Sequence, residues 1–157
     1  MERTRDYSYS RGIPSTAAVA NHPIHPMLVN FPIAFLSSGL ATDVTYLWTG
    51  DVFWAKATFW VVAFGFTIGM VAAVAGLTDY LTVRRIRHYF SSSNHMVAAI
   101  MLLATAFANL LARLGERVEA VYPWGIVLSA VTALMVAVAG WLGGKLVFEY
   151  NVGTAED

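Results

Sequence analysis

The chain has 157 residues, of which 57% are hydrophobic and 13% charged, with a mean hydropathy of +0.58. This composition is typical of an integral membrane protein and leaves no room for a separate soluble catalytic domain. The net charge of zero argues against a nucleic-acid partner, which calls for a concentrated basic surface. The absence of cysteine excludes disulfides, thiolate metal sites, iron–sulfur clusters and covalently attached c-type haem within this chain.

The first 21 residues are polar, lack a signal-peptide pattern and are predicted to form a cytoplasmic tail. A single four-span domain is predicted from 22 to 153, because four stretches are long and apolar enough to cross a bilayer. The expected spans are 27–48, 54–80, 95–114 and 124–148, with a C-terminal tail over 154–157. Short connections make neighbouring spans antiparallel, which predicts an all-α, integral membrane four-helix bundle with up-down topology. No internal repeat is apparent.

Lysine and arginine predict the orientation of the bundle. Seven of them fall on the side of the termini and three on the other side. The seven are Arg3, Arg5, Arg11, Arg84, Arg85, Arg87 and Lys145, and the three are Lys56, Arg113 and Arg117. The positive-inside rule then places both termini in the cytoplasm. We expect a multi-pass protein of a bacterial inner membrane, in contact with lipid.

Small residues predict where helices approach closely. Gly65, Gly69, Ala73 and Gly76 follow one another along the second span, and Ala133, Ala137, Gly140 and Gly144 along the fourth. In lipid, such stripes let helix backbones come together. The second and fourth spans are therefore predicted to pack closely.

The pentad His22-Pro23-Ile24-His25-Pro26 opens the first span. Each proline restricts the residue before it to extended conformations, and Pro26 is suited to the first position of a helix, so His25 is expected to be held rigidly there. Pro32, about two turns further on, is expected to bend the span. Neutral imidazole is a common metal ligand. The alternative interpretation is that both rings are interfacial groups bonded to water, backbone or lipid.

His95 follows the run Ser91–Asn94, which is predicted to cap the third span. In an up-and-down bundle the first and third spans run parallel on opposite sides of the core, so His25 and His95 are expected to face each other at one depth. That arrangement suits a b-type haem held by two imidazoles, with His22 as a substitute ligand. His88 lies among arginines in a loop and is expected to be solvated.

Three further polar residues lie within the spans. Asp79, near the cytoplasmic end of the second span, is expected either to orient an imidazole through a hydrogen bond or to pair with Arg84 or water. Asp43 lies about 24 Å along the first span, at 1.5 Å per residue, toward the opposite end. Together with Asn109 on the third span it is expected to mark a second polar cluster, because an intramembrane carboxylate is seldom without a role.

Four motifs together resemble a family of uncharacterised bacterial four-span membrane proteins. They are His22-Pro23-Ile24-His25-Pro26, Phe31-Pro32-Ile33-Ala34, Gly76-Leu77-Thr78-Asp79-Tyr80 and Gly140 to Phe148, read as GWLGGKLVF. The resemblance singles out His22, His25, Asp43, Asp79, His95, Gly143 and Gly144. Members often carry asparagine where this chain has Ala99. Some relatives are fused to Rieske-type iron–sulfur domains, which implies membrane electron transfer.

These observations leave three functions open. The first is a haem b subunit for electron transfer, with His25 and His95 as axial ligands, Asp79 beside them and a separate redox protein as partner. The second is a non-haem metal site formed by His22, His25, His95 and Asp79, since nitrogen and oxygen ligands suit zinc or iron. The third is a cofactor-free scaffold or assembly subunit of a membrane complex. No catalytic activity of its own is expected, because no nucleophile elbow, phosphate-binding loop or HExxH motif is present.

Overall fold

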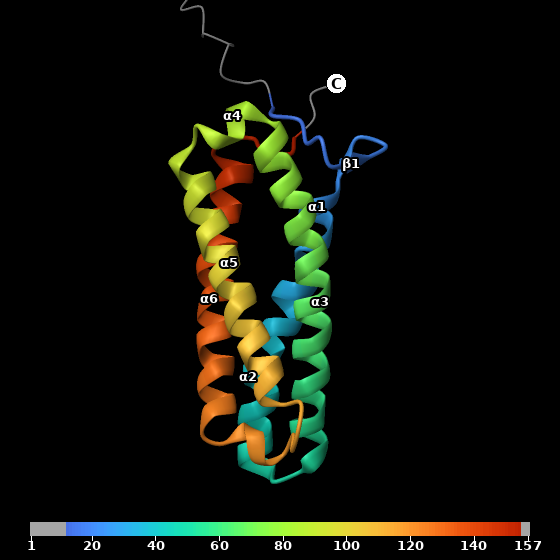
Figure 1. The fold of residues 1–157 in the computed structure, drawn as a ribbon, viewed down its shortest axis with the longest axis vertical. Coiled ribbons are helices and arrows are strands. Elements are labelled where there is room, and N and C mark those ends of the chain that lie inside the picture. Colours follow the sequence, from blue (N-terminus) through green and yellow to red (C-terminus); the bar gives the residue numbers. More distant parts are fainter. Residues whose placement is uncertain (1–11, 155–157) are drawn as a thin grey trace, which may run out of the picture.

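The computed structural model describes residues 12–154, in which four long helices stand side by side (Figure 1). The first span, Ile24–Thr49, consists of α1 (Ile24–Leu28) and α2 (Asn30–Thr49). The other spans are α3 (Val52–Thr82), α5 (Phe90–Ala112) and α6 (Trp124–Phe148). The shorter elements are β1 (Ala18–Val19), β2 (His22–Pro23), α4 (Arg84–Arg87) and η2 (Glu119–Val121). The predicted all-α bundle of four membrane-spanning helices is confirmed.

The first span is interrupted at Val29, between α1 and α2. Pro32 lies three residues later and lacks the N–H that would donate to the carbonyl of Leu28. The helix therefore loses a hydrogen bond one turn after His25, which leaves α1 as a separate short turn that carries this histidine.

Each long helix packs against two others. α2 contacts α3 and α6, and α5 contacts α6 and α3, so α2 lies diagonally opposite α5 and α3 opposite α6. The second and fourth spans, α3 and α6, therefore do not pack mainly on each other. The small residues of α3 receive the flanking helices instead, because a methyl group at Gly65 would lie 2.8 Å from Leu36 of α2. A methyl group at Gly69 would lie 3.0 Å from Leu103 of α5.

The third span begins earlier than expected. α5 starts at Phe90, preceded by Tyr89 without a side-chain cap, so the run Ser91–Asn94 lies within the helix and does not cap it. Tyr89 stacks against Tyr150, with ring centroids 4.4 Å apart, at the end of α6. This aromatic contact lies next to the start of α5, and the start at Phe90 places His95 in the second turn of the helix.

Residues 12 to 23 fold back over one end of the bundle, which we call the terminal end because residues 12 and 154 lie there (Figure 1). Ile13 is buried and forms a bridge with Val152 beyond the end of α6. β1 and β2 form a small antiparallel hairpin that leads into α1. The predicted tail thus includes a segment ordered against the bundle, while residues 1–11 lie outside the described part.

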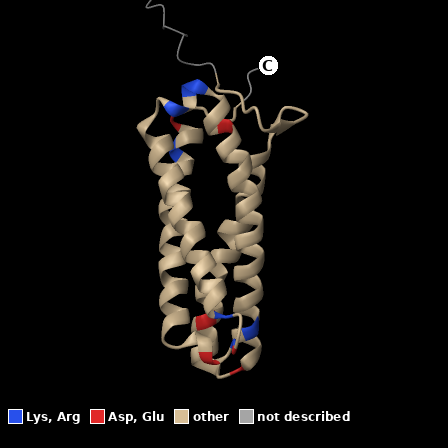
Figure 2. Cartoon of the chain, viewed as in Figure 1, with Lys and Arg blue, Asp and Glu red and all other residues tan. Residues whose placement is uncertain are grey.

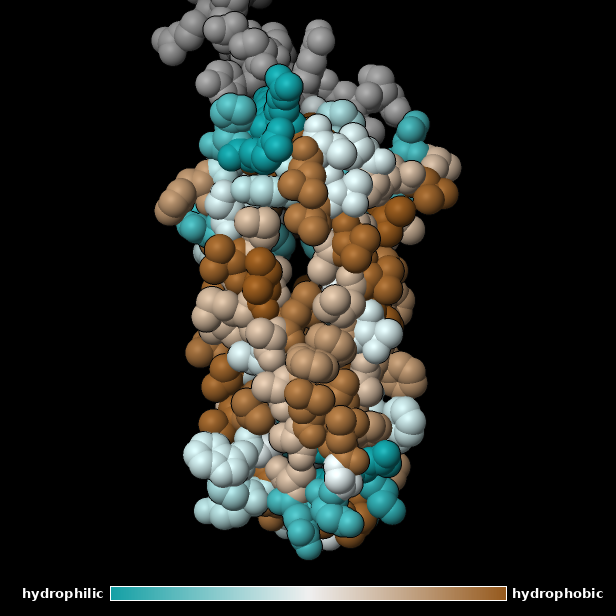
Figure 3. All heavy atoms as spheres, in the orientation of Figure 1, coloured by the Kyte–Doolittle hydropathy of each residue, from teal (hydrophilic) through white to brown (hydrophobic). Residues whose placement is uncertain are grey.

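The surface is apolar around the middle of the bundle and polar at both ends (Figure 3). Charged residues gather at the two ends and are sparse between them (Figure 2). Large side chains such as Trp141 and Phe148 point outward, 75% and 86% exposed. The interior is built on Leu36, Val62, Ala106 and Val136, one from each long helix. Such a surface matches the hydrocarbon core of a bilayer flanked by its polar interfaces.

Candidate functional site

His25 and His95 meet inside the bundle near the terminal end. Their ring centroids lie 6.1 Å apart, and the ring planes are inclined by 81°. His25 comes from α1 and His95 from α5, on opposite sides of the core. The up-and-down connectivity is what brings two histidines 70 positions apart to the same depth, because both follow a chain reversal at the same end.

Both imidazoles are tethered through the same ring atom. Nδ1 of His25 donates to the carbonyl of Ala72 at 2.7 Å, and Nδ1 of His95 donates to the carbonyl of Ala139 at 3.0 Å. Because a carbonyl oxygen only accepts, each Nδ1 carries the hydrogen. The neutral ring then has its lone pair on Nε2, the atom through which such a histidine binds a metal or accepts a hydrogen bond.

Two glycines lie against these rings. A methyl group at Gly76 would be 2.8 Å from Nδ1 of His25, and one at Gly143 would be 3.0 Å from Cε1 of His95. Real Cβ atoms avoid such distances, so each imidazole occupies the space that a side chain would otherwise fill. At one glycine each, α3 and α6 therefore let a histidine ring lie directly against the helix backbone.

Two cavities, of about 230 and 390 Å³, are both lined by His25 and His95. The smaller one extends toward the terminal end, where Asp79 and Ser92 line it, and the larger extends toward the middle of the bundle. A hollow between α3 and α5 is visible in this half of the molecule (Figure 3). Most other lining residues are apolar or small. The larger cavity has a volume in the range of small-molecule sites.

The other two histidines lie elsewhere. His22 is exposed in β2, where its Nδ1 donates to the carbonyl of Ala20 at 2.7 Å. His88 is exposed after α4, and its Nδ1 donates to the carbonyl of Arg84 at 2.8 Å. Neither lines the two cavities. The structure therefore brings together two of the four histidines.

Asp79 binds the polypeptide backbone of the terminal segment. Its carboxylate accepts hydrogen bonds from the backbone N–H groups of Thr16 and Ala17 at 2.8 and 2.9 Å. It also accepts from the hydroxyls of Ser15 and Thr16 at 2.7 and 3.1 Å. These donors occupy the carboxylate, while the imidazoles donate to backbone carbonyls. Asp79 therefore fixes the terminal segment just before β1.

No group of three or more His, Cys, Asp or Glu side chains suited to a metal ion occurs within residues 12–154. His22 and Asp79 are bonded as described, away from the two facing rings. What remains is a two-nitrogen site, which is the axial ligand set that a haem iron takes.

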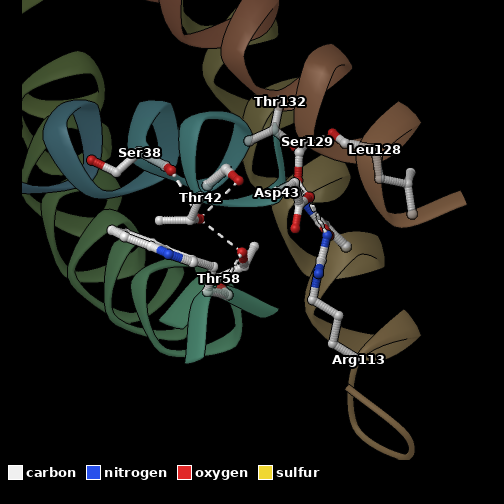
Figure 4. A network of polar contacts seen from close by, with 11 residues as sticks. Ser38, Thr42, Asp43, Thr58, Arg113, Leu128, Ser129 and Thr132 are labelled. Carbon is white, nitrogen blue, oxygen red and sulfur yellow. Dashed lines mark hydrogen bonds and ion pairs between the residues drawn. The ribbon is translucent and has the colours of Figure 1, made fainter. Parts of the chain in front are cut away.

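A second polar cluster lies at the other end of the bundle (Figure 4). Asp43 forms an ion pair with Arg113, whose Nη2 is 2.6 Å from Oδ2, and both side chains are fully buried. Ser129 donates to the same carboxylate oxygen at 2.7 Å. Asn109 accepts from Nε of Arg113 at 2.8 Å and donates to Ser129 at 3.0 Å. The structure thus joins Asp43 and Asn109 through two residues that were not expected there.

Sequence reasoning missed Arg113 and Ser129 as members of this cluster. Arg113 lies at the end of the predicted span 95–114 and was considered only as one of the three basic residues on that side of the membrane. The available signal was its spacing, because it lies four residues after Asn109 and so on the same helix face. Asp43 Oδ1 and Arg113 Nη1 are buried without a hydrogen-bond partner in the described part of the chain.

Comparison with known proteins gives one relationship. No curated protein and no solved structure shows a significant match to this chain. A family model described as "Predicted membrane protein (DUF2231)" matches residues 21–156, which include all four spans and the histidine pair. Because the match covers most of the sequence, the chain belongs to this family of predicted membrane proteins.

Proposed function

We propose that the protein binds a b-type haem between His25 and His95 and serves as an electron-transfer subunit of a membrane redox system. The observation that carries this proposal is the spacing of the two rings. When two imidazole nitrogens bind one metal from opposite sides at about 2.0–2.1 Å each, the ring centroids lie about 6.3 Å apart. The observed separation is 6.1 Å.

The tethering of the rings also fits an axial ligand pair. Metal-binding histidines usually donate their second ring N–H to a carbonyl or carboxylate, which fixes the tautomer and the ring orientation. Both rings do so through Nδ1, which leaves Nε2 to bind iron. A bound haem supplies reversible one-electron chemistry, and the chain supplies the two ligands and their orientation.

The surroundings suit a flat, mostly apolar group. The cavities extend from the histidine pair in two directions, toward the terminal end and toward the middle of the bundle. Small residues of α3 and α6, among them Ala73 and Gly140, leave room beside the rings. Ser92, whose buried hydroxyl has no partner within residues 12–154, lines the cavity at the terminal end and can donate to a polar edge of a bound group.

The proposal also concerns the membrane in which the protein lies, its orientation there and its redox partner. The seven-to-three excess of lysine and arginine supports cytoplasmic termini in a bacterial inner membrane, which places the histidine pair near the cytoplasmic face. A separate redox subunit then acts as electron donor or acceptor. A non-haem metal site has less support, since His22 and Asp79 are engaged elsewhere.

The test is the visible spectrum of detergent-purified protein from haem-replete cells, with pyridine haemochrome and metal analysis. We expect a Soret band that is lost in His25→Ala and in His95→Ala and retained in His88→Ala. His88 is the matched control because it is an exposed histidine with the same type of backbone hydrogen bond. A colourless, metal-free wild-type protein overturns the proposal and favours a scaffold, and a stoichiometric non-haem ion favours the metal alternative.

A further inference from the structure

The bundle consists of two hairpins with the same design. The first hairpin comprises α1, α2 and α3, and the second comprises α5 and α6. Each begins at the terminal end, and each carries its histidine near the start of its first helix (Figure 1). In both, the ring donates to a carbonyl of the following long helix, at Ala72 or at Ala139.

The first helices of the two hairpins correspond at a shift of 70 residues. This shift relates His25 to His95 and the buried core residues Leu36 and Ala106. It also relates Gly39 to Asn109 and Asp43 to Arg113, all of them buried. The ion pair between Asp43 and Arg113 thus joins two corresponding positions, as the histidine contact does.

The second helices correspond at a shift of 67 residues. The buried residues of α6 are Gly125, Ser129, Thr132, Val136, Ala139 and Leu146. In the same order they correspond to Thr58, Val62, Gly65, Gly69, Ala72 and Asp79, every one of which is buried in α3. The same shift relates the two carbonyls that accept from the histidines and the two glycines, Gly76 and Gly143, that lie against the rings.

We infer that the four spans are two equivalent hairpins related by a pseudo-two-fold axis along the bundle, and that Gly76 and Gly143 are equivalent positioning residues for the histidine pair on that axis. Corresponding helices run in the same direction, so the axis is parallel to the helices and passes between the members of each contacting pair. The expected effect of the two glycines on haem binding rests on the function proposed above. Their effect on the positions of the two imidazole rings is independent of it.

The role of the glycines follows from the direction of helical side chains. A side chain on a helix covers the turn that precedes its own Cα. A side chain at position 76 would therefore cover the carbonyl of Ala72, and one at position 143 would cover that of Ala139. Each carbonyl has a second lone pair beyond the one used within the helix. Glycine leaves that lone pair open to Nδ1.

The equivalence makes a specific prediction. Gly76→Ala should displace His25 and leave His95 in place, and Gly143→Ala should do the reverse. Gly140→Ala is the matched control, because it lies one turn earlier on α6 and a methyl group there meets nothing within 4 Å. A general loss of helix packing would instead move both rings in either variant.

The experiment uses full-length protein without haem, labelled with ¹⁵N-histidine, and records the ring nitrogens by NMR. In the wild type both rings should appear as the Nδ1–H tautomer with a hydrogen-bonded Nδ1. Loss of that signature in only the facing ring of each variant is the expected result. Unchanged ring signals in Gly76→Ala and Gly143→Ala overturn the proposal, as does an equal change of both rings.

A double-mutant cycle keeps the proposal testable should a glycine variant fold poorly. Gly76→Ala should lower the unfolding midpoint when His25 is present and leave it unchanged in the His25→Ala background, because the clash requires the ring. Equal losses in both backgrounds would contradict the proposed contact. In haem-loaded protein, Gly76→Ala and Gly143→Ala should each lower haem affinity about 10–100-fold. Gly115→Ala should not, because Gly115 lines neither cavity and a methyl group there meets nothing within 4 Å.

The two proposals fail in different ways. A wild-type protein that takes up no haem, but shows the ring-specific NMR changes, overturns the proposed function and retains the positioning residues. A protein that takes up haem as well in Gly76→Ala and Gly143→Ala as in the wild type retains the proposed function and overturns the positioning role.

Discussion

The buried ion pair offers the sharpest test of how this bundle is stabilised. Asp43 and Arg113 are both fully buried and are 2.6 Å apart. Replacing Asp43 with alanine leaves a guanidinium in the core with Asn109 and Ser129 as its remaining polar neighbours. An isolated buried charge has lost its hydration without gaining a counter-charge, so the cost falls on the folded state.

The magnitude follows from this uncompensated charge. Removing one member of a buried pair costs about 3–5 kcal/mol, whereas replacing both by apolar residues of similar volume is about neutral or stabilises by about 1–4 kcal/mol. We therefore expect Asp43→Ala to lower the folded-to-unfolded ratio by about two to three and a half powers of ten. Asp43→Leu combined with Arg113→Met should recover most of that loss.

Equilibrium unfolding in mixed micelles, followed by a probe of helix association, measures Asp43→Ala and a cycle of the wild type, Asp43→Leu, Arg113→Met and the double variant. The exposed residue Lys56, at the same end of the bundle, supplies the control variant Lys56→Met, which should change stability by less than about 0.5 kcal/mol. If the double variant is as unstable as the sum of its two single variants, the two charges do not compensate each other and the reasoning is wrong.

Two further perturbations test other parts of the structure. Asp79→Ala removes a carboxylate that accepts four hydrogen bonds. Because one hydrogen bond to a charged group contributes about 1.5–3 kcal/mol, amide hydrogen exchange at Thr16 and Ala17 should accelerate by at least about tenfold. Unchanged protection of these two amides would contradict the anchoring role of Asp79. Gly65→Ala places a methyl group 2.8 Å from Leu36 and should cost about 1–3 kcal/mol. Adding Leu36→Ala should then cost less than it does in the wild type, and strict additivity would refute the contact.

The sequence was sufficient to predict the four spans, because twenty or so apolar residues in succession have few other structural uses. Their order and short connections also placed His25 and His95 on diagonal helices. The start of α5 was harder, because serine and asparagine favour helix caps in general, while the contact between Tyr89 and Tyr150 joins residues distant in sequence. A contact between residues distant in sequence thus accompanies a helix start that the local preference of serine and asparagine for helix caps did not predict.

Helix neighbours were predicted less well than helices. The glycine stripes on α3 and α6 indicate close approach, but a stripe does not identify its partner. Gly65 receives Leu36, whereas Gly76 receives an imidazole. The relationship between the hairpins was invisible for a similar reason, since corresponding positions such as Asp43 and Arg113 share burial and depth but carry opposite charges. Residue type alone does not show that two positions are both buried, because burial depends on the fold.

The ion pair between the hairpins also constrains the order of assembly. Asp43 belongs to a span that is synthesised before the one that leads into Arg113, so Asp43 enters the membrane region before its partner exists. A charged side chain in a membrane helix costs about 2.5–3.5 kcal/mol at its centre and is tolerated best near the interface, where both residues lie. Docking of the second hairpin onto the first removes both costs at once. Either hairpin alone therefore retains an unpaired charge on its inner face, which distinguishes a half-assembled protein chemically from the finished bundle.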